Sequence, residues 1–488
     1  MKWSAIGVVL PVIAWAFLLA RLSGDRRGFL KHLPTAAGMG LGTSSVVWWA
    51  LMLLPLASRT SLLAADAAFW ALACLAAWRL GRSPLSEERA PFSEKGAPAT
   101  AHEGGPRLWA VRWLPFVLLA IVLAGAGVYF VAASVTQPHG TWDAWAIWNA
   151  RARFLFRGYP GVWMDAFSPA LDWSHPDYPL LVPVSVVRAW TYIGGDRVIV
   201  PIVLAATFCA AIVSTAASSV ARSGSAWRGV LTAVMLLASP AFLANAVAQW
   251  ADIPLAFYIL TTCVSIGRAT EPGSRPSWWA VAGVSVGLAA WTKNEGLVFA
   301  AIVLTVCSTW MYRSDRWRGL ARVVPVLAGA APILAALVVF KLFFAPPNDL
   351  MAAQSIDHVL TNLRDVDRLQ MVAAAVGKEL WFGGASLVGV LPILAMFVLT
   401  TGIRRPVPTG PALGVACASA LIVVDMLVYV LTPHDLVWHL RTSLERVVVQ
   451  VFPAIVWCGM SLADVRPRAL TADDRASLTP LSGPATVG

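Results

Sequence analysis

Long runs of apolar residues recur from one end of the chain to the other, and they restrict its fold more than any other feature. Hydrophobic residues occupy 58% of the 488 positions, whereas charged residues occupy only 13%. A run of about 20 apolar residues is long enough to cross a bilayer as an α-helix, which satisfies its own backbone hydrogen bonds in hydrocarbon. The sequence therefore predicts an all-α, polytopic membrane protein.

The apolar runs predict about thirteen membrane-spanning helices. They lie near residues 3–20, 35–57, 62–80, 113–133, 198–220, 227–247, 252–268, 277–292, 297–312, 323–344, 383–402, 411–431 and 447–463. We interpret the first run as a retained helix, because it lacks the strongly basic start and the small-residue cleavage site of a signal peptide. If the apolar run 178–195 also crossed the membrane, every later loop would be inverted, so we predict an interfacial helix there.

The basic residues are concentrated in alternate connections between these spans. Those connections hold 23 of the 37 lysines and arginines but only 10 of the 26 acids. Because cytoplasmic loops retain Lys and Arg, we predict that this set faces the cytoplasm, with the N-terminus outside and the C-terminus inside. The charge is therefore a topology signal for the plasma or inner membrane, and we expect no nucleic-acid partner.

Two polar segments divide the chain. Residues 83–112 begin with a stretch rich in Pro, Gly, Ser and charge, which predicts a flexible cytoplasmic loop. This loop separates an N-terminal three-span unit, 1–82, from a larger transmembrane unit, 113–464, and residues 465–488 are typical of a disordered cytoplasmic tail. The six cysteines all lie in apolar runs without a CxxC pair, so we expect them to pack as small hydrophobes.

Polar residues of both signs gather in the predicted outer connections, which hold five of the seven histidines. Such a gathering on one face of a hydrophobic protein indicates a site at that membrane interface. The candidate site residues are Trp142, Asp143, His175, Asp177, Tyr178, Asp252, Lys293, Glu295, His434, His439, Arg441 and Arg446.

The stretch "TWDAWAIWNARARFLFRG", residues 141–158, combines three tryptophans, three arginines and Asp143. Wound as a helix, it places an apolar arc on one side and Asp143, Arg153 and Arg157 off that arc. The arc consists of Ala144, Trp145, Trp148, Ala152, Leu155 and Phe156. This pattern predicts an amphipathic helix in the headgroup region. Taken alone, it is equally typical of an aromatic belt with an acid that starts a helix.

Other outer motifs have ordinary structural explanations. In "HPDYPLLVPV", His175 and Asp177 are potential metal ligands, but a turn that starts a helix is the simpler explanation. Asp252 stands where a helix-capping acid is expected. The spacing of Gly283 and Gly287, before Lys293, predicts close helix packing.

Two further acids, Asp66 and Asp425, lie within predicted spans, where an acid is costly. Each of these acids could form a hydrogen bond between helices, or it could take part in catalysis or in an ion path.

In their order along the chain, the outer motifs resemble those of the GT-C class of polytopic glycosyltransferases, which includes protein O-mannosyltransferases and lipid A aminoarabinose transferases. The class places a key Asp in the first outer loop after a span, similar to Asp143 in "TWDAW", and follows it with a "YPPL"-like segment, here "HPDYPLL". A second acid in the next outer loop is matched by Asp252 in "WADIPLA", and a "GxxxGxxxxTK" helix end by "GVSVGLAAWTKNEG". The resemblance covers about residues 113–310, and Ala144 stands where many members have another acid.

The resemblance implies transfer of a hexose or pentose from a polyprenyl-phosphate carrier to a hydroxyl of a glycan, lipid or protein acceptor. The reaction would take place on the outer face, among membrane lipids, with inversion at the anomeric carbon. A phosphate leaving group needs cations, for which Arg446, Arg441 and Lys293 are the candidates. The acceptor hydroxyl needs a base, for which we favour Asp143, with Asp252 as its partner or as the group that positions the acceptor.

The remaining candidates would line the substrate pocket: Trp142, His175, Asp177, Tyr178, Glu295, His434 and His439. We find no cluster of residues with the spacing typical of metal ligands, so we expect metal-independent catalysis without a cofactor.

Two other functions remain open at this point. A transporter or lipid flippase would need polar residues along a path at mid-membrane depth, where only Asp66 and Asp425 come close. A ligase or polymerase of lipid-linked glycans would favour Arg and His in a large outer loop, which the 432–446 segment suggests only faintly.

Overall fold

The computed structural model describes residues 4–24, 28–56, 58–82, 106–347, 355–385 and 387–465. Within these ranges every regular element is a helix, apart from a single bridge between Ile403 and Ala463. The predicted all-α class is therefore confirmed. Residues 83–105, in the predicted flexible loop, and 466–488, in the predicted tail, lie outside the described residues.

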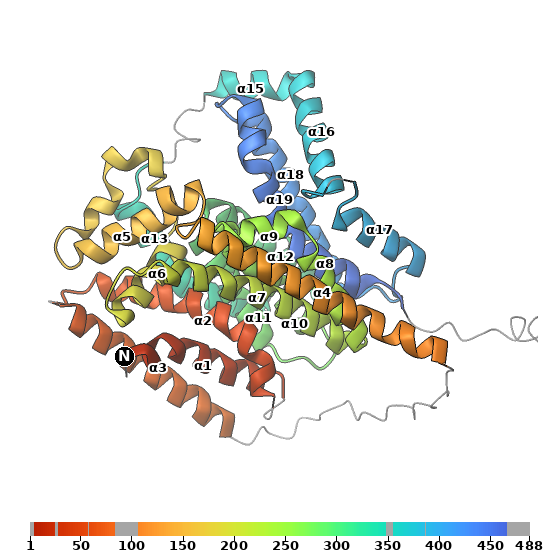
Figure 1. Cartoon of the computed structure of the whole chain (residues 1–488), viewed down its shortest axis with the longest axis horizontal. Coiled ribbons are helices and arrows are strands. Elements are labelled where there is room, and N and C mark those ends of the chain that lie inside the picture. Colours follow the sequence, from red (N-terminus) through yellow and green to blue (C-terminus); the bar gives the residue numbers. More distant parts are fainter. Residues whose placement is uncertain are drawn as a thin grey trace, which may run out of the picture.

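The N-terminal unit consists of α1 (Ser4–Leu22), α2 (Phe29–Met52) and α3 (Arg59–Arg82). Helix α2 packs on helices of the larger unit as well as on α1, whereas α3 lies mainly against α1 (Figure 1). The next helix, α4 (Pro106–Thr136), begins inside the segment predicted as a loop and packs against α8. The N-terminal unit is thus joined to the rest of the fold by direct packing.

A run of short helices follows α4. A π-helix, η1 (Ala144–Trp148), continues directly into α5 (Asn149–Gly158), and two 3-10 turns, η2 (Trp163–Phe167) and η3 (Pro169–Ser174), lead to α6 (Leu181–Ile193). Helix α6 has 13 residues. At about 1.5 Å per residue, such a helix is too short to cross the hydrocarbon core unaided.

The main bundle is built around one buried helix, α10. Its helices are α7 (Ile199–Ser223), α8 (Ala226–Leu237), α9 (Pro240–Val247), α10 (Asp252–Ala269), α11 (Ser277–Thr292), α12 (Asn294–Leu320) and α13 (Val323–Phe343). Almost every side chain of α10 is buried, because α7, α11, α18 and α19 surround it. The predicted glycine contact is also present: a Cβ on Gly283 would lie 2.0 Å from the Val326 carbonyl oxygen, so α11 and α13 approach closely.

The C-terminal helices are α15 (Ile356–Arg364), α16 (Val366–Phe382), α17 (Val390–Thr401), α18 (Thr409–Leu431) and α19 (Leu436–Leu462). Figure 1 shows α15 and α16 beside the end of the α18–α19 pair, away from the main bundle. Helix α19 then returns into the bundle and packs on α10. The turn between α18 and α19 and the start of α10 are thereby linked through one long helix.

Among the described helices, seven are long and apolar enough to cross a membrane, or eight if α8 and α9, which meet at a 69° bend, form one broken span. These helices establish an integral membrane protein. Every predicted span overlaps a helix, but the predicted number of about thirteen crossings is not confirmed, because the other helices are shorter or less apolar.

Candidate active site

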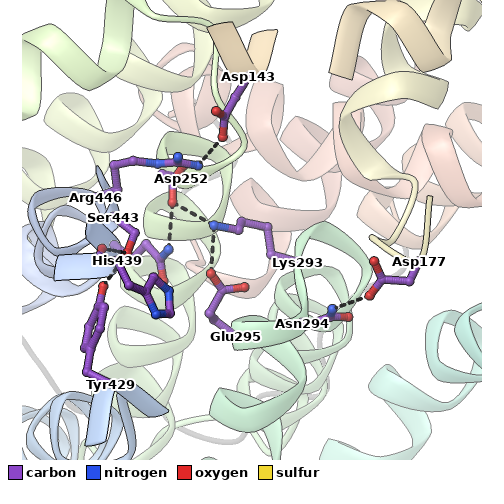
Figure 2. A network of polar contacts seen from close by, with 11 residues as sticks. Asp143, Asp177, Asp252, Lys293, Asn294, Glu295, Tyr429, His439, Ser443 and Arg446 are labelled. Atoms are coloured by element: carbon purple, nitrogen blue, oxygen red, sulfur yellow. Dashed lines mark hydrogen bonds and ion pairs between the residues drawn. The ribbon is translucent and has the colours of Figure 1, made fainter. Parts of the chain in front are cut away.

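Asp252 lies at the centre of a buried network of charges (Figure 2). It is the first residue of α10, where the exposed N–H groups and the helix dipole favour an acid. Lys293 Nζ lies 3.0 Å from Oδ1, Gln450 Nε2 donates to Oδ1 at 2.7 Å, and Arg446 Nη2 lies 3.2 Å from Oδ2. These three partners allow the carboxylate to remain charged although it is wholly buried.

Arg446 joins Asp143 and Asp252, the two acids that we predicted to act together. Its Nη2 atom lies 2.6 Å from Asp143 Oδ2 and 3.2 Å from Asp252 Oδ2, and Figure 2 shows the guanidinium between them. The guanidinium carbon also lies 4.3 Å from the centre of the Trp250 ring. A planar guanidinium suits this position, because it forms charge-assisted hydrogen bonds in its plane and stacks on an aromatic face.

Lys293 is the second cation of the network. It occupies the extended residue between α11 and α12, and its Nζ lies 3.0 Å from Asp252 and 2.7 Å from Glu295. Burial lowers the pKa of the lysine, but the carboxylates of Asp252 and Glu295 raise it further, to above the usual value for lysine. The ammonium group therefore stays charged at physiological pH.

The signs of these charges alternate through space. Three carboxylates, Asp143, Asp252 and Glu295, share two cations, Arg446 and Lys293. Asp252 is wholly buried, whereas Asp143 and Glu295 keep 14% and 24% of their side-chain surface exposed. Of the three carboxylates, Asp143 and Glu295 are thus the two that solvent or a ligand reaches.

The "HPDYP" turn lies beside this network and is held by a buried arginine. Arg151 of α5 donates to the carbonyl oxygens of Ser174, His175 and Tyr178. Burial lowers the pKa of Arg151 to about 10, against the opposing influence of Asp177. Arg151 was not among the candidate residues, yet it fixes the backbone of a turn that carries three of them.

The Asp177 side chain of this turn faces α12 and α13. Asp177 accepts from the Asn294 amide at 2.9 Å (Figure 2), and Lys341 Nζ lies 3.8 Å from its carboxylate. Tyr178 is stacked between Trp148 and His175, and Lys293 Nζ lies 6.0 Å from its ring centre. Burial raises the pKa of Tyr178, with further contributions from the nearby acids, so its phenol is neutral.

The two C-terminal candidate histidines, His434 and His439, lie where α18 meets α19. The His439 ring lies 4.8 Å from the Tyr429 ring, and its Nδ1 atom is 2.9 Å from the Thr432 hydroxyl. Tyr429 shares a hydrogen bond with Ser443 (Figure 2). His434 is exposed, with its ring 6.0 Å from that of His439.

Two further candidates, Arg441 and Trp142, also lie outside the charge network. Arg441 is exposed on α19, more than one turn before Arg446. Trp142 is half exposed and packs against Trp145. The structure therefore brings together Asp143, Asp252, Lys293, Glu295 and Arg446, and it places the "HPDYP" turn next to them.

The stretch 141–158 departs from the expected regular helix. Trp145, predicted on the apolar arc, is 48% exposed, whereas the other five residues of that arc are buried. The cause is the π-helix over Ala144–Trp148, whose wider turn changes the angle between successive side chains. Trp148 is also wholly buried against Tyr178.

Several polar partners were missed by the sequence analysis: Trp250, Asn294, Lys341 and Gln450. Gln450 was detectable, because it is a polar residue inside the apolar run "RVVVQVFP", one helical turn after Arg446. Asn294 and Lys341 had no comparable signal in the sequence, since their contacts with Asp177 join α12 and α13 to a turn far away along the chain.

A narrow, mainly apolar cavity lies next to the network. Its wall comes mainly from α6, α7 and the start of α10, including Val186, Leu204, Ala205 and Ile253. Trp250, which stacks on Arg446, closes one part of it, and the Asn149 and Gln249 side chains supply its polar lining.

Residues 174–342 match the family model of dolichyl-phosphate-mannose-protein mannosyltransferases. The match supports a membrane glycosyltransferase of the GT-C class. It confirms the resemblance drawn from the motifs, and it contains the "HPDYP" turn, Asp252 and Lys293, whereas Asp143 and Arg446 lie on either side of it. No curated protein and no solved structure matches the chain.

Proposed function

We propose that this GT-C-class protein transfers a sugar from a polyprenyl-phosphate carrier to an acceptor hydroxyl, with inversion, on the outer face of the membrane. The observation that carries the proposal is the position of Arg446 between Asp143 and Asp252, beside Lys293. One connected network thus offers cations for a phosphate and a partly exposed carboxylate for a proton.

The cations would bind the donor phosphate. Arg446 offers a planar set of donors, and Lys293 offers a charged ammonium group. The network already contains three carboxylates for two cations, so a phosphate has to compete with one of them. At Arg446, which contacts Asp143 and Asp252, Asp143 is the carboxylate that gives way, because Asp252 is fully buried and has two further partners. Donor binding would therefore release Asp143 from Arg446.

The released carboxylate would act as the general base. The acceptor oxygen attacks the anomeric carbon, the bond from that carbon to the phosphate oxygen breaks, and the hydroxyl proton passes to Asp143. Polyprenyl phosphate leaves with the negative charge that Arg446 and Lys293 stabilise. Asp252 holds the two cations in place, and a single displacement inverts the anomeric centre.

The narrow apolar cavity would mark the path of the first isoprenoid units of the carrier and would have to widen to admit them. It adjoins Trp250, so a phosphate at Arg446 would lie within reach of a chain in the cavity. The distribution of basic loops supports placing this end of the bundle on the outer side of the plasma or inner membrane. The acceptor would be a glycan, a lipid or a protein that reaches this face.

Substitution of Asp143 tests the proposal. Asp143→Asn removes the base but keeps the shape of the side chain, so we expect loss of sugar transfer in membranes supplied with polyprenyl-phosphate-linked sugar. Asp172→Asn is the matched control, because Asp172 is an exposed acid of the same segment. Membrane levels of both variants should equal those of the wild type. Full transfer activity in Asp143→Asn would refute the proposed mechanism.

A further inference from the structure

The loop that carries Asp143 is fastened to the turn that precedes Asp252. The Thr141 amide donates to the Ala248 carbonyl oxygen at 3.3 Å. Gln249 Nε2 donates to the Pro138 carbonyl oxygen at 3.2 Å, and its Oε1 accepts from Asn149 Nδ2 at 3.1 Å. Asn149 Nδ2 also lies 3.4 Å from the His139 carbonyl oxygen. We call the Asn149–Gln249 side-chain pair, with the Thr141–Ala248 backbone bond, the amide latch.

The latch is buried and contains a strained residue. Asn149 and Gln249 are only 2% and 6% exposed, so their amide groups must be satisfied inside the protein. Gln249 has a φ of 62°, a left-handed conformation that is unfavourable for a residue with a long side chain. The two hydrogen bonds of its amide offset this cost. Strain retained at a buried polar contact is a reason to look for a functional role.

Gly140 allows the two segments to approach each other. Its φ of 74° favours glycine, and a Cβ there would lie 2.6 Å from the Ala248 carbonyl oxygen and 2.5 Å from the Ala144 Cβ. Any other residue at position 140 would therefore push the loop away from the turn. The approach brings Asp143, three residues after Gly140, towards Asp252, three residues after Gln249.

We propose that the amide latch positions Asp143 for catalysis by fixing its distance from Asp252 and from the Arg446 that both acids share. This inference rests on the proposed function, in which Asp143 accepts the proton. Asn149, Gln249 and Gly140 are positioning residues, since they act through the Asp143 loop. A displacement of a reacting group by about 1 Å is enough to lower a rate by about 10²-fold.

Gly140→Ala is the decisive variant, and Gly194→Ala is its matched control. Gly194 also has a left-handed φ, of 82°, but a Cβ there would meet nothing within 4 Å. Both variants place alanine at a left-handed φ, so a difference between them reports the close contacts of position 140 with Ala248 and Ala144. We expect Gly140→Ala to lower kcat by about 10- to 100-fold, with the KM for the donor changed by less than about twofold. Gly194→Ala should stay near the wild type.

A second variant covers the case in which Gly140→Ala does not fold. Asn149→Asp keeps the size of the side chain but replaces its donor with an acceptor that faces Gln249 Oε1 and the His139 carbonyl oxygen. Because Asn149 also borders the apolar cavity, this variant is judged on kcat at saturating donor. We expect a loss of kcat similar to that of Gly140→Ala.

Hydrogen exchange of the purified protein supplies a measurement that does not depend on activity. Peptides that contain Thr141 should exchange faster in Gly140→Ala and Asn149→Asp than in the wild type or Gly194→Ala. Wild-type kcat in both latch variants, with Asp143→Asn inactive, would overturn the positioning role while leaving the proposed function intact. If Asp143→Asn itself is active, the proposed function fails, and with it the catalytic role of the latch. Unchanged exchange would then also refute the latch as a structural restraint.

Discussion

Arg446 is the residue on which the two predicted acids converge. Its guanidinium lies against Asp143, Asp252 and the Trp250 ring at the same time. Removal of the arginine leaves Asp143 without this partner and Asp252 with Lys293 and Gln450. These three contacts therefore require a planar cation with several N–H donors, and a positive charge alone does not replace the guanidinium.

We predict that Arg446→Lys lowers kcat/KM for the lipid-linked donor by about 10²-fold, because a lysine cannot reproduce the planar set of donors. Arg446→Ala should lower it further. Initial rates of sugar transfer over a range of donor concentrations measure the effect. Arg222→Ala is the control, since Arg222 forms a more exposed ion pair with Glu271, a type worth at most about 1 kcal/mol. A wild-type kcat/KM in Arg446→Ala would exclude a role in phosphate binding.

At the scale of elements, α6, α7 and α10 form the wall of the apolar cavity next to the charge network. Ala205 of α7 faces this cavity, whereas Val203, two residues earlier, is 54% exposed on the outside of the same helix. A substitution at Ala205 therefore changes the cavity, whereas the same substitution at Val203 changes only the outer surface of α7.

Ala205→Trp should fill the cavity and raise the KM for the polyprenyl donor by about tenfold or more, with a smaller change in kcat, because the isoprenoid chain contributes to ground-state and transition-state binding alike. Val203→Trp adds the same side chain on the exposed side and should leave KM unchanged. Steady-state kinetics with one donor in detergent micelles make the comparison. An equal KM for both variants would show that the donor chain lies elsewhere.

The elements were predictable from the sequence to different degrees. Hydropathy located helices such as α7 and α18, because a run of apolar residues in a membrane leaves few alternatives to a helix. The π-helix at Ala144–Trp148 was not predictable, since it depends on how the 141–158 stretch packs around Trp148 and Tyr178. Gln249 and Asn149 also escaped notice, because their pairing joins residues 100 positions apart. Order along the chain indicated the charged candidates, but only tertiary structure shows which of them meet.

For the whole molecule, the N-terminal unit is a structural part of the bundle that carries the charge network. Trp49 of α2 packs against Trp291 and Phe340, and Ser45 accepts a hydrogen bond from the Trp291 indole. Trp291 lies two residues before Lys293 on α11. The unit therefore supports the helix end that presents the second cation.

A buried ion pair fastens the same unit to α6. Asp66 of α3 is wholly buried, and Arg188 of α6 lies 2.8 Å from its Oδ2 atom. Tyr192 donates to the same carboxylate at 2.6 Å, and Arg188 donates to the Gly7 carbonyl oxygen of α1. Of the two roles open for Asp66, these contacts support the hydrogen bond between helices over an ion path.

We predict that Arg188→Met destabilises the protein by about 3–5 kcal/mol, because it leaves the Asp66 carboxylate buried without its cation. The double variant Asp66→Leu/Arg188→Met should regain much of this loss, since neither charge then remains unpaired. Thermal unfolding of the purified protein in detergent measures both changes, with Arg222→Ala as the exposed-pair control. Sugar transfer should fall in Arg188→Met together with the folded fraction, because the N-terminal unit supports the helix end before Lys293. A melting temperature unchanged in Arg188→Met would contradict the role of the ion pair, and full activity after loss of the folded N-terminal unit would contradict its support of the site.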